Sequence, residues 1–95
     1  MEKLDEFAKE SLDFCQRMDW TKDWVKGGCY IFLEAAEFVE ACRGKGDPLE
    51  ELGDVLNTIL SVAEFYGLKP SDAIKVCRKK MKVMLKEKEI NNERK

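Results

Sequence analysis

The 95-residue sequence contains no histidine, only two prolines and no pair of cysteines in a CxxC spacing. Without histidine or such a pair, a zinc site is not expected. Both prolines stand where helices would begin, which argues against an all-β fold. No apolar run approaches the roughly 20 residues of a membrane span. The sequence therefore predicts a helical protein with no membrane partner.

Composition and length agree with one small domain. Apolar residues make up 44% of the chain and charged residues 38%, as in a soluble helical protein with a modest core. The first seven residues, MEKLDEF, are charged and lack the apolar core of a signal peptide, so we expect a cytoplasmic protein. Four cysteines lie among apolar residues at helical spacing, which predicts buried free thiols in a reducing compartment: Cys15, Cys29, Cys42 and Cys77.

Hydrophobic periodicity predicts four helices, over residues 2–18, 29–43, 48–66 and 69–88. The fold class is all-α, with one domain over residues 1–88 and a polar tail over 89–95 that frays. Residues 19–28 interrupt the apolar periodicity, and Gly27-Gly28 is expected to mark a break between the first two helices. Asp47 is the expected N-cap of the third helix, and Gly67 its left-handed C-cap residue.

The second predicted helix is apolar almost all round. Between Cys29 and Cys42 its only charges are Glu34, Glu37 and Glu40. A helix of this kind is buried on several sides, and a 95-residue chain has too little protein to bury it alone. We therefore expect a homo-oligomer, either a dimer or a tetramer.

Two carboxylate pairs stand on consecutive helices. Glu34 and Glu37 are three residues apart, as are Glu51 and Asp54, so each pair shares a helix face and the two pairs can face each other across a helical hairpin. Carboxylates about 5 Å apart repel by roughly 3 kcal/mol per pair. Protons or a divalent cation would relieve that repulsion, and all-oxygen ligands suit Mg²⁺, with Mn²⁺ as an alternative.

Glu34-Ala-Ala-Glu37, followed after thirteen residues by Glu51-Leu-Gly-Asp54, resembles the ExxE…ExxD signature of MazG-like nucleoside triphosphate pyrophosphohydrolases. This all-α superfamily includes the dimeric dUTPases, dCTP pyrophosphatases and phosphoribosyl-ATP pyrophosphatases. The resemblance covers about residues 20–85, including GDVLN and the glycine turn into a lysine-rich helix. It implies a four-helix MazG-like bundle completed by homo-oligomerisation, and Mg²⁺-dependent hydrolysis of an NTP or dNTP to the monophosphate and pyrophosphate. It also favours Glu34/Glu37 over the alternative pair Glu37/Glu40.

Several other residues are candidates for substrate binding. Trp20 and Trp24 either cap the core or line a nucleobase pocket, as an aromatic segment before the first acidic helix does in the resembling family. Lys26 is either a phosphate contact or a surface residue. Asn57 lies one turn beyond Asp54, so it can hydrogen-bond a metal-bound water or the substrate, or else face a partner helix.

The charge of the chain is divided unevenly. Residues 1–68 hold 15 acidic and 7 basic residues, whereas residues 69–95 hold 4 acidic and 10 basic residues. The resemblance places a phosphate-binding lysine near the end of the fourth helix. Lys80 matches it best, with Arg78 and Lys79 as alternatives, although Met84 stands where the family often has asparagine. A plain solvated basic helix is the other interpretation.

Two further classes of protein remain open at this stage. One is a non-catalytic helical oligomeric module that binds nucleic acid or an acidic partner through its basic fourth helix. The other is a di-iron bundle, which the absence of histidine disfavours because such sites use Glu-x-x-His motifs. The same absence disfavours a phosphoribosyl-ATP pyrophosphatase, whose third helix usually carries a histidine. Leu33 replaces an acidic residue that many family members carry.

Overall fold

The computed structural model describes residues 2–20 and 23–94. Within these ranges all regular secondary structure is helical, in the order α1 (Glu2–Arg17), α2 (Lys26–Cys42), α3 (Pro48–Phe65) and α4 (Pro70–Glu93). The predicted all-α class is confirmed, and the described part of the chain has four helices as expected. None of these helices is long and apolar enough to cross a membrane.

Two helix boundaries differ from the sequence prediction. Helix α2 begins at Lys26, so Gly27-Gly28 lies inside a helix and the predicted break there is wrong. Asp23 Oδ1 accepts a hydrogen bond from the backbone N–H of Lys26 at 2.8 Å. The N–H groups of Gly27 and Gly28 bond to the carbonyls of Asp23 and Trp24, so helical hydrogen bonding already includes the two glycines. Helix α4 reaches Glu93 instead of ending at residue 88, because the predicted tail contains good helix formers and neither Gly nor Pro. Residues 1, 21–22 and 95 of the predicted segments lie outside the described residues.

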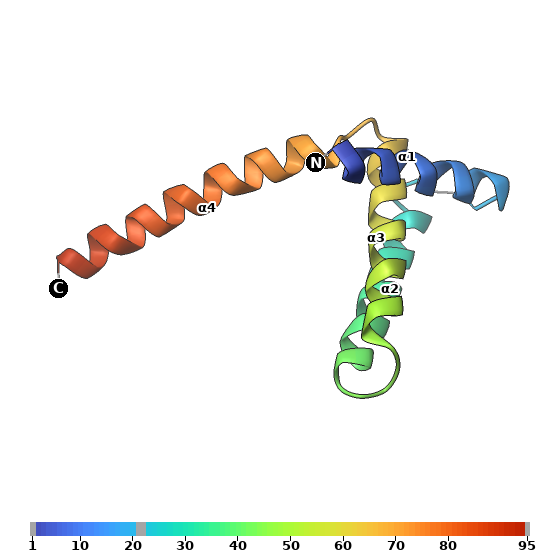
Figure 1. The fold of residues 1–95 in the computed structure, drawn as a ribbon, viewed down its shortest axis with the longest axis horizontal. Helices are drawn as coiled ribbons and strands as arrows, with labels where there is room; N and C mark the ends of the chain where they lie inside the picture. The colour runs from blue at the N-terminus through green and yellow to red at the C-terminus, as the bar shows by residue number, and fades with distance from the viewer. Residues whose placement is uncertain (1, 21–22, 95) are drawn as a thin grey trace.

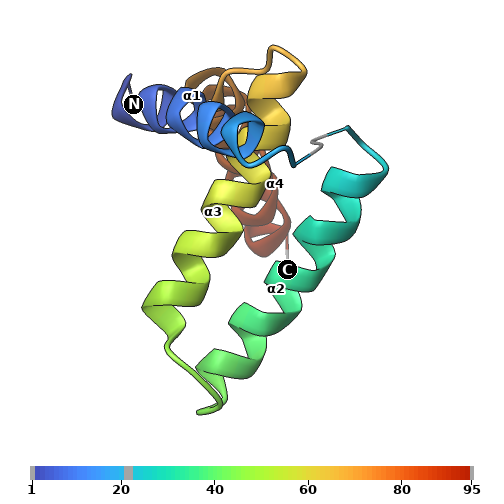
Figure 2. The same cartoon turned by 90° about the vertical axis from the view of Figure 1, so that its right-hand side faces the viewer.

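Helices α2 and α3 form an antiparallel hairpin, and α1 crosses the far end of α3 (Figure 2). The residues of α1 that are buried recur at three- and four-residue steps: Ala8, Ser11 and Cys15. On α3 the buried residues are Thr58, Leu60 and Ser61. Such small side chains let two helix axes approach closely. The single chain therefore packs its three N-terminal helices around few large apolar residues.

The ends of α3 follow the sequence prediction. Asp47 is the N-cap, and its Oδ1 accepts a hydrogen bond from the backbone N–H of Leu49 at 3.0 Å. At the other end Gly67 adopts φ +70°, and the N–H of Leu68 bonds to the carbonyl of Ala63 at 2.9 Å. This is the Schellman pattern that a left-handed glycine permits. Both caps confirm the predicted boundaries of the helix that carries Glu51.

Replacing the N-cap Asp47 with alanine should lower the free energy of unfolding by about 1 kcal/mol, because the N–H of Leu49 loses its acceptor. Urea denaturation monitored by circular dichroism measures the loss. Glu50→Gln is the matched control on the same exposed first turn, with an expected change within about 0.5 kcal/mol. Equal losses for the two variants would contradict the assignment of Asp47 as the cap.

Helix α4 projects away from the other three helices (Figure 1). Its start is held against α1, where the carboxylate of Asp5 accepts hydrogen bonds from the backbone N–H of Ser71 at 2.8 Å and from its hydroxyl at 2.5 Å. These two bonds lower the pKa of Asp5. Beyond Ile74 every described side chain of α4 is exposed. The three- and four-residue spacing of its apolar residues predicts a buried seam made of Ala73, Ile74, Cys77, Met81 and Met84 or Leu85. Within one chain that prediction is wrong, because only Ile74 of these residues is even half-buried.

The cysteines are all free thiols, as expected. Only Cys15 is buried, between α1 and its neighbours, whereas Cys29, Cys42 and Cys77 are exposed in the single chain. The prediction of four buried thiols is thus correct for Cys15 alone. The reason is that α2 and α4 each present an apolar face that no described part of the chain, residues 2–20 and 23–94, covers.

Candidate metal centre

The α2–α3 hairpin brings three of the four predicted carboxylates together. One carboxylate oxygen each of Glu34, Glu37 and Glu51 lies within 4.8 Å of the other two. Glu34 and Glu37 come from adjacent turns of α2, and Glu51 comes from the first turn of α3. The antiparallel pairing of the two helices therefore turns two short sequence motifs into one carboxylate cluster.

Two oxygens of this cluster are buried without a hydrogen-bond partner, Oε2 of Glu34 and Oε2 of Glu51. Both side chains are half-buried, whereas Glu37 is exposed. A buried carboxylate oxygen that lacks a donor carries a large desolvation cost, so such atoms usually have a proton, a donor or a cation beside them. A proton or a cation shared by the cluster would remove that cost.

The same environment alters the acidity of the cluster. Burial is the largest cause that raises the pKa of Glu34, and the negative charges of Glu37, Asp54 and Glu51 raise it further. Burial also raises the pKa of Glu51, again with contributions from Glu37 and Asp54. In both residues the charged form is disfavoured by loss of water and by like charges. A bound cation would remove the second cause and offset the first.

Asp54 lies beside the cluster but is not one of its three closest members. Its side chain is exposed, and its charge acts on both Glu34 and Glu51. It also lines the same cavity as Glu34. Asp54 can therefore reach a ligand held by the three glutamates, from the side that faces the cavity.

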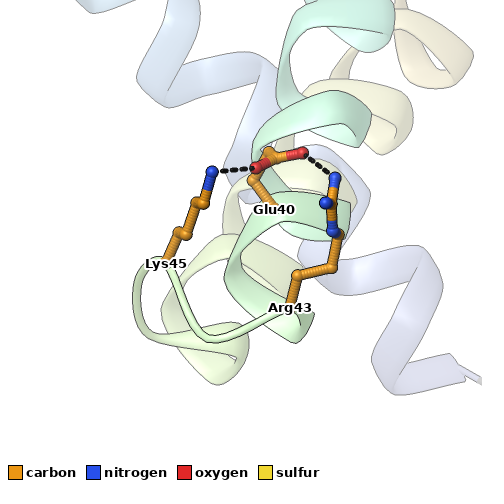
Figure 3. A network of polar contacts seen from close by, with 3 residues as sticks. All are labelled: Glu40, Arg43 and Lys45. Atoms are coloured by element: carbon orange, nitrogen blue, oxygen red, sulfur yellow. Dashed lines mark hydrogen bonds and ion pairs between the residues drawn. The ribbon is translucent and has the colours of Figure 1, made fainter.

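Glu40, the alternative member of the first pair, is engaged elsewhere. Figure 3 shows its carboxylate between the side chains of Arg43 and Lys45, with oxygen–nitrogen distances of 2.9 Å and 3.6 Å. These basic residues belong to the end of α2 and the turn after it. The geometry thus favours Glu34/Glu37 over Glu37/Glu40 as the acidic pair of α2.

The cluster fits a small hard cation in chemistry, and in size only after its side chains move. Its donors are carboxylate oxygens, which Mg²⁺ and Mn²⁺ prefer. Two Mg²⁺ ligands on opposite sides of the ion lie about 4.2 Å apart, given Mg–O distances near 2.1 Å. Adjacent ligands of such an ion lie only about 3.0 Å apart, and at most one pair of three ligands can be opposite, so oxygens up to 4.8 Å apart must approach by up to about 1.8 Å to reach ligand spacing.

A cavity of about 430 Å³ adjoins the cluster. Its volume is in the range of small-molecule sites. Glu34 and Asp54 form its acidic side, and two of the candidate substrate contacts, Trp20 and Asn57, line it. The remaining lining residues were not predicted: Phe14, Tyr30 and Thr58. An aromatic cavity with an acidic side suits a ligand that has a flat ring at one end and phosphates at the other.

The backbone after α1 determines where the indole of Trp20 lies. Asp19 adopts φ +60°, and the N–H of Trp20 bonds to the carbonyl of Cys15 at 2.9 Å. This turn directs Trp20 back onto α1, where its ring meets Phe14 edge-on with centroids 5.5 Å apart. Aspartate tolerates the left-handed conformation better than most residues.

Three residues that line the cavity were not predicted, because the sequence patterns that could indicate them are weak. Tyr30 lies four residues before Glu34 and therefore shares its helix face, which could have indicated it. Thr58 lies four residues after Asp54 and donates a hydrogen bond to the carbonyl of that residue at 2.9 Å. Phe14 belongs to the amphipathic pattern of α1, and nothing in the sequence separates it from core residues.

Four predicted substrate contacts do not line this cavity within one chain. Trp24 is 75% exposed, and its backbone N–H donates to the hydroxyl of Tyr66 at 2.7 Å. Lys26 is an exposed residue at the start of α2. Arg78 and Lys80 stand on α4, which leaves the far end of α3 and runs away from the hairpin (Figure 1). The single chain therefore does not bring the predicted phosphate-binding bases to the carboxylates.

Neither family models, curated proteins nor solved structures match this chain. Its function is therefore inferred from two features of the described residues. One is the three-glutamate cluster with its unpartnered buried oxygens. The other is the aromatic cavity that shares Glu34 with that cluster.

The raised pKa values predict an unusual pH dependence in metal-free buffer. A raised native pKa means that the folded state binds protons more tightly than the unfolded state. The contribution of Glu34 and Glu51 to the free energy of unfolding is therefore fully present at pH below the ordinary glutamate pKa. It is lost as the pH rises through the raised pKa values of the folded state. We expect the melting temperature of the wild type to fall relative to Glu34→Gln as pH rises through that window.

Thermal melts from mildly acidic to neutral pH, with a chelator present, measure this difference. Asp5 changes the stability in the opposite direction, since its lowered pKa means that its contact with Ser71 weakens as pH falls. Subtracting the Glu34→Gln profile removes the contribution of Asp5, which both proteins share. Parallel profiles for the two proteins would rule out a repulsive cluster.

Proposed function

We propose that this chain is a Mg²⁺-dependent nucleoside triphosphate pyrophosphohydrolase of the MazG-like type, which hydrolyses an NTP or dNTP to the monophosphate and pyrophosphate. The observation that carries the proposal is the meeting of Glu34, Glu37 and Glu51, with two buried oxygens that have no hydrogen-bond partner. This placement agrees with the ExxE…ExxD resemblance in the sequence. Asp54, the last residue of that signature, stands beside the cluster.

The cluster would hold Mg²⁺ through Glu34, Glu37 and Glu51, with Asp54 on the cavity side. When bound, the ion supplies positive charge for the phosphate oxygens and a more acidic water. Glu37 is exposed, so a water molecule can approach its carboxylate. A carboxylate that is not fully engaged by the ion can orient that water and accept its proton.

The cavity would bind the base and sugar. Trp20, Phe14 and Tyr30 present aromatic surface, on which a nucleobase can stack. Asn57 offers both a donor and an acceptor for the edge of the base or a sugar hydroxyl. Glu34 and Asp54 form the acidic side of the cavity, so the phosphate end of the substrate would lie there with its cation.

The proposed active unit is a homo-oligomer, a dimer or tetramer, in which subunits complete a four-helix bundle around the hairpin. The exposed apolar faces of α2 and α4 support this assembly. We propose a cytoplasmic location, because the cysteines are free thiols and three of them are exposed in the single chain.

Pyrophosphate release from a panel of canonical and modified nucleotides, with and without Mg²⁺, tests the proposal. We expect release of pyrophosphate and the matching monophosphate from at least one triphosphate, and no release when a chelator is present. Release of orthophosphate would indicate a different bond cleavage. No release from any nucleotide would favour the alternative, a non-catalytic module that binds nucleic acid or an acidic protein through α4.

A further inference from the structure

The α2–α3 hairpin is closed at both of its ends, by different means. At one end the short turn after α2 joins the two helices covalently (Figure 2). At the other end the backbone N–H of Trp24 donates a hydrogen bond to the hydroxyl of Tyr66 at 2.7 Å, and this bond is called the tether below. The two buried residues of α2, Gly27 and Ala41, lie near these two ends. The residues of α2 between them are half-buried or exposed.

The end of α3 determines where Tyr66 lies. Tyr66 is the C-cap residue of this helix, and its backbone N–H bonds to the carbonyls of Val62 and Ala63, both at 3.2 Å. Gly67 follows with φ +70°, so the helix ends directly after the tyrosine. The ring of Tyr66 also meets the ring of Phe65 edge-on, with centroids 5.1 Å apart. The helix end and the ring contact together restrict the position of the hydroxyl.

Tyr66 supplies an acceptor that the start of α2 needs. The first N–H groups of a helix have no acceptor within that helix. Helical hydrogen bonding in α2 begins with Asp23 and Trp24, whose carbonyls accept from the N–H groups of the two glycines of the first turn. The N–H of Lys26 bonds to the side chain of Asp23, whereas the N–H of Trp24 bonds to Tyr66 of the other helix. Of these two bonds, the tether is the one that links α2 to α3.

The aromatic cavity lies between the two closed ends of the hairpin. On α2 its lining residues Tyr30 and Glu34 come six and ten residues after Trp24, which is about 9 and 15 Å along a helix. On α3 the lining residue Thr58 comes eight residues before Tyr66, or about 12 Å. A change at the tether therefore alters the separation of the two helices that form the walls of the cavity.

The tether acts on the two parts of the site to different extents. When it is lost, α2 can tilt about the turn at its other end, and each displacement grows with distance from that turn. For every 1 Å of movement at Trp24, Tyr30 would move about 0.7 Å and Glu37 about 0.3 Å, given 1.5 Å of rise per residue. The aromatic end of the site is thus more sensitive to the tether than the glutamate cluster is.

We propose that Tyr66 is a positioning residue for the substrate: its hydroxyl holds the start of α2 against the end of α3 and thereby sets the width of the cavity between Tyr30 and Thr58. The tether itself stands on the geometry of the hairpin alone. Its effect on a nucleotide rests on the function proposed above. Tyr66 is not among the residues that line the cavity, so it acts through α2 and not by contact with the ligand.

Hydrogen exchange of single amides, followed by NMR on the full chain, tests the tether without reference to activity. Tyr66→Phe removes the hydroxyl and keeps the ring. In this variant the Trp24 amide should exchange about fivefold faster than in the wild type, because it has lost its acceptor. Equal exchange of the Trp24 amide in the two proteins would overturn the tether.

Asp23→Ala is the matched control. It also removes one hydrogen bond at the start of α2, but that bond lies within the helix start and does not link α2 to α3. The Lys26 amide should exchange faster in this variant. Any effect of Tyr66→Phe that Asp23→Ala shares is therefore an effect of helix capping, and an effect that it does not share belongs to the link between the helices.

Binding of uncleavable nucleotides tests the positioning role. The probes are the α,β-imido analogues of ATP, CTP, GTP and UTP and of their deoxy forms, with Mg²⁺ present. For the analogue that the wild type binds most tightly, Tyr66→Phe should raise Kd about fivefold, because the closed hairpin is populated that much less. Asp23→Ala should leave Kd within about twofold. A saturating analogue should also slow exchange of the Trp24 amide in the wild type by at least about fivefold, since coupling between two sites is reciprocal.

Two further measurements distinguish positioning of the substrate from a general loss of structure. In Tyr66→Phe, kcat on the matching triphosphate should change by less than about twofold, because bound substrate holds the hairpin closed. The rise in melting temperature on addition of Mg²⁺ should equal that of the wild type, because the glutamate cluster lies nearer the turn. A lowered kcat with unchanged KM, or a lost response to Mg²⁺, would overturn the positioning role.

The remaining outcomes separate the tether, its role and the proposed function. Faster exchange of the Trp24 amide with an unchanged Kd would retain the tether and overturn the positioning role. Equal effects of Tyr66→Phe and Asp23→Ala on Kd would overturn it as well. A wild type that binds none of the analogues would refute the proposed function and the role in nucleotide binding together, whereas the exchange rates of the Trp24 amide would still decide the tether.

Discussion

Glu51→Gln should reduce Mg²⁺-dependent pyrophosphate release by about 100-fold or more, because loss of a cation ligand removes several kcal/mol of transition-state stabilisation. Asp54→Asn should cause a loss of the same kind, since Asp54 faces the cluster from the cavity side. Both substitutions retain the shape of the side chain and remove only its charge. Initial rates at saturating Mg²⁺ and nucleotide measure the effect.

Glu50→Gln is the matched control for these variants. Glu50 is adjacent to Glu51 on the first turn of α3, is exposed, and does not belong to the three-glutamate cluster. Its substitution should leave activity within about twofold. A metal-free melt should also show Glu51→Gln at least as stable as the wild type, because a repulsive charge has gone. Equal damage from Glu50→Gln and Glu51→Gln would refute the assigned cluster.

Saturating Mg²⁺ should raise the melting temperature strongly, because the ion binds the folded cluster and not the unfolded chain. At a concentration 100 times the dissociation constant the gain is about 2.7 kcal/mol, which corresponds to roughly 10–20 °C for a domain of this size. Differential scanning fluorimetry over a Mg²⁺ titration measures the shift. Zn²⁺, which prefers nitrogen and sulfur ligands, provides a useful comparison.

Two controls separate specific binding from general screening of charge. KCl at matched ionic strength should give a much smaller shift, because exposed charges are screened without a ligand site being filled. Glu51→Gln should lose most of the Mg²⁺ shift, whereas Glu50→Gln should keep it. A wild-type melting temperature that does not change with Mg²⁺ would exclude a structural role for the ion in this cluster.

The predictions that held rest on short-range physics. The N-cap at Asp47 and the left-handed Gly67 follow from the chemistry of single residues and their immediate neighbours. The helical period also indicated that carboxylates of the two helices could meet, as Glu34, Glu37 and Glu51 do, whereas Asp54 stands beside them. The short turn between α2 and α3 requires antiparallel neighbours, so the sequence by itself predicts that acidic residues of the two helices come close together.

The predictions that failed depended on contacts between distant parts of the chain. The predicted start of α2 is too late because two consecutive glycines are typical of a break, whereas the N–H groups of Gly27 and Gly28 already form helical hydrogen bonds to Asp23 and Trp24. The buried seam of α4 was assigned from periodicity, which shows that a stripe is apolar but not which element covers it. The same limit explains the exposed thiols of Cys29, Cys42 and Cys77.

The sequence alone determined the all-α class and the approximate helices. It also determined the two acidic pairs and the division between an acidic centre and a basic end. These features depend on propensity, capping and charge, which are properties of neighbouring residues. Only the tertiary structure decided that Asp54 stands beside a three-glutamate cluster, that Phe14 and Tyr30 join Trp20 in one cavity, and that α4 carries Arg78 and Lys80 away from its own site. These features depend on the direction in which α1 crosses α3 and on the direction in which α4 leaves α3. Side-chain packing determines both directions, and no local sequence pattern encodes them.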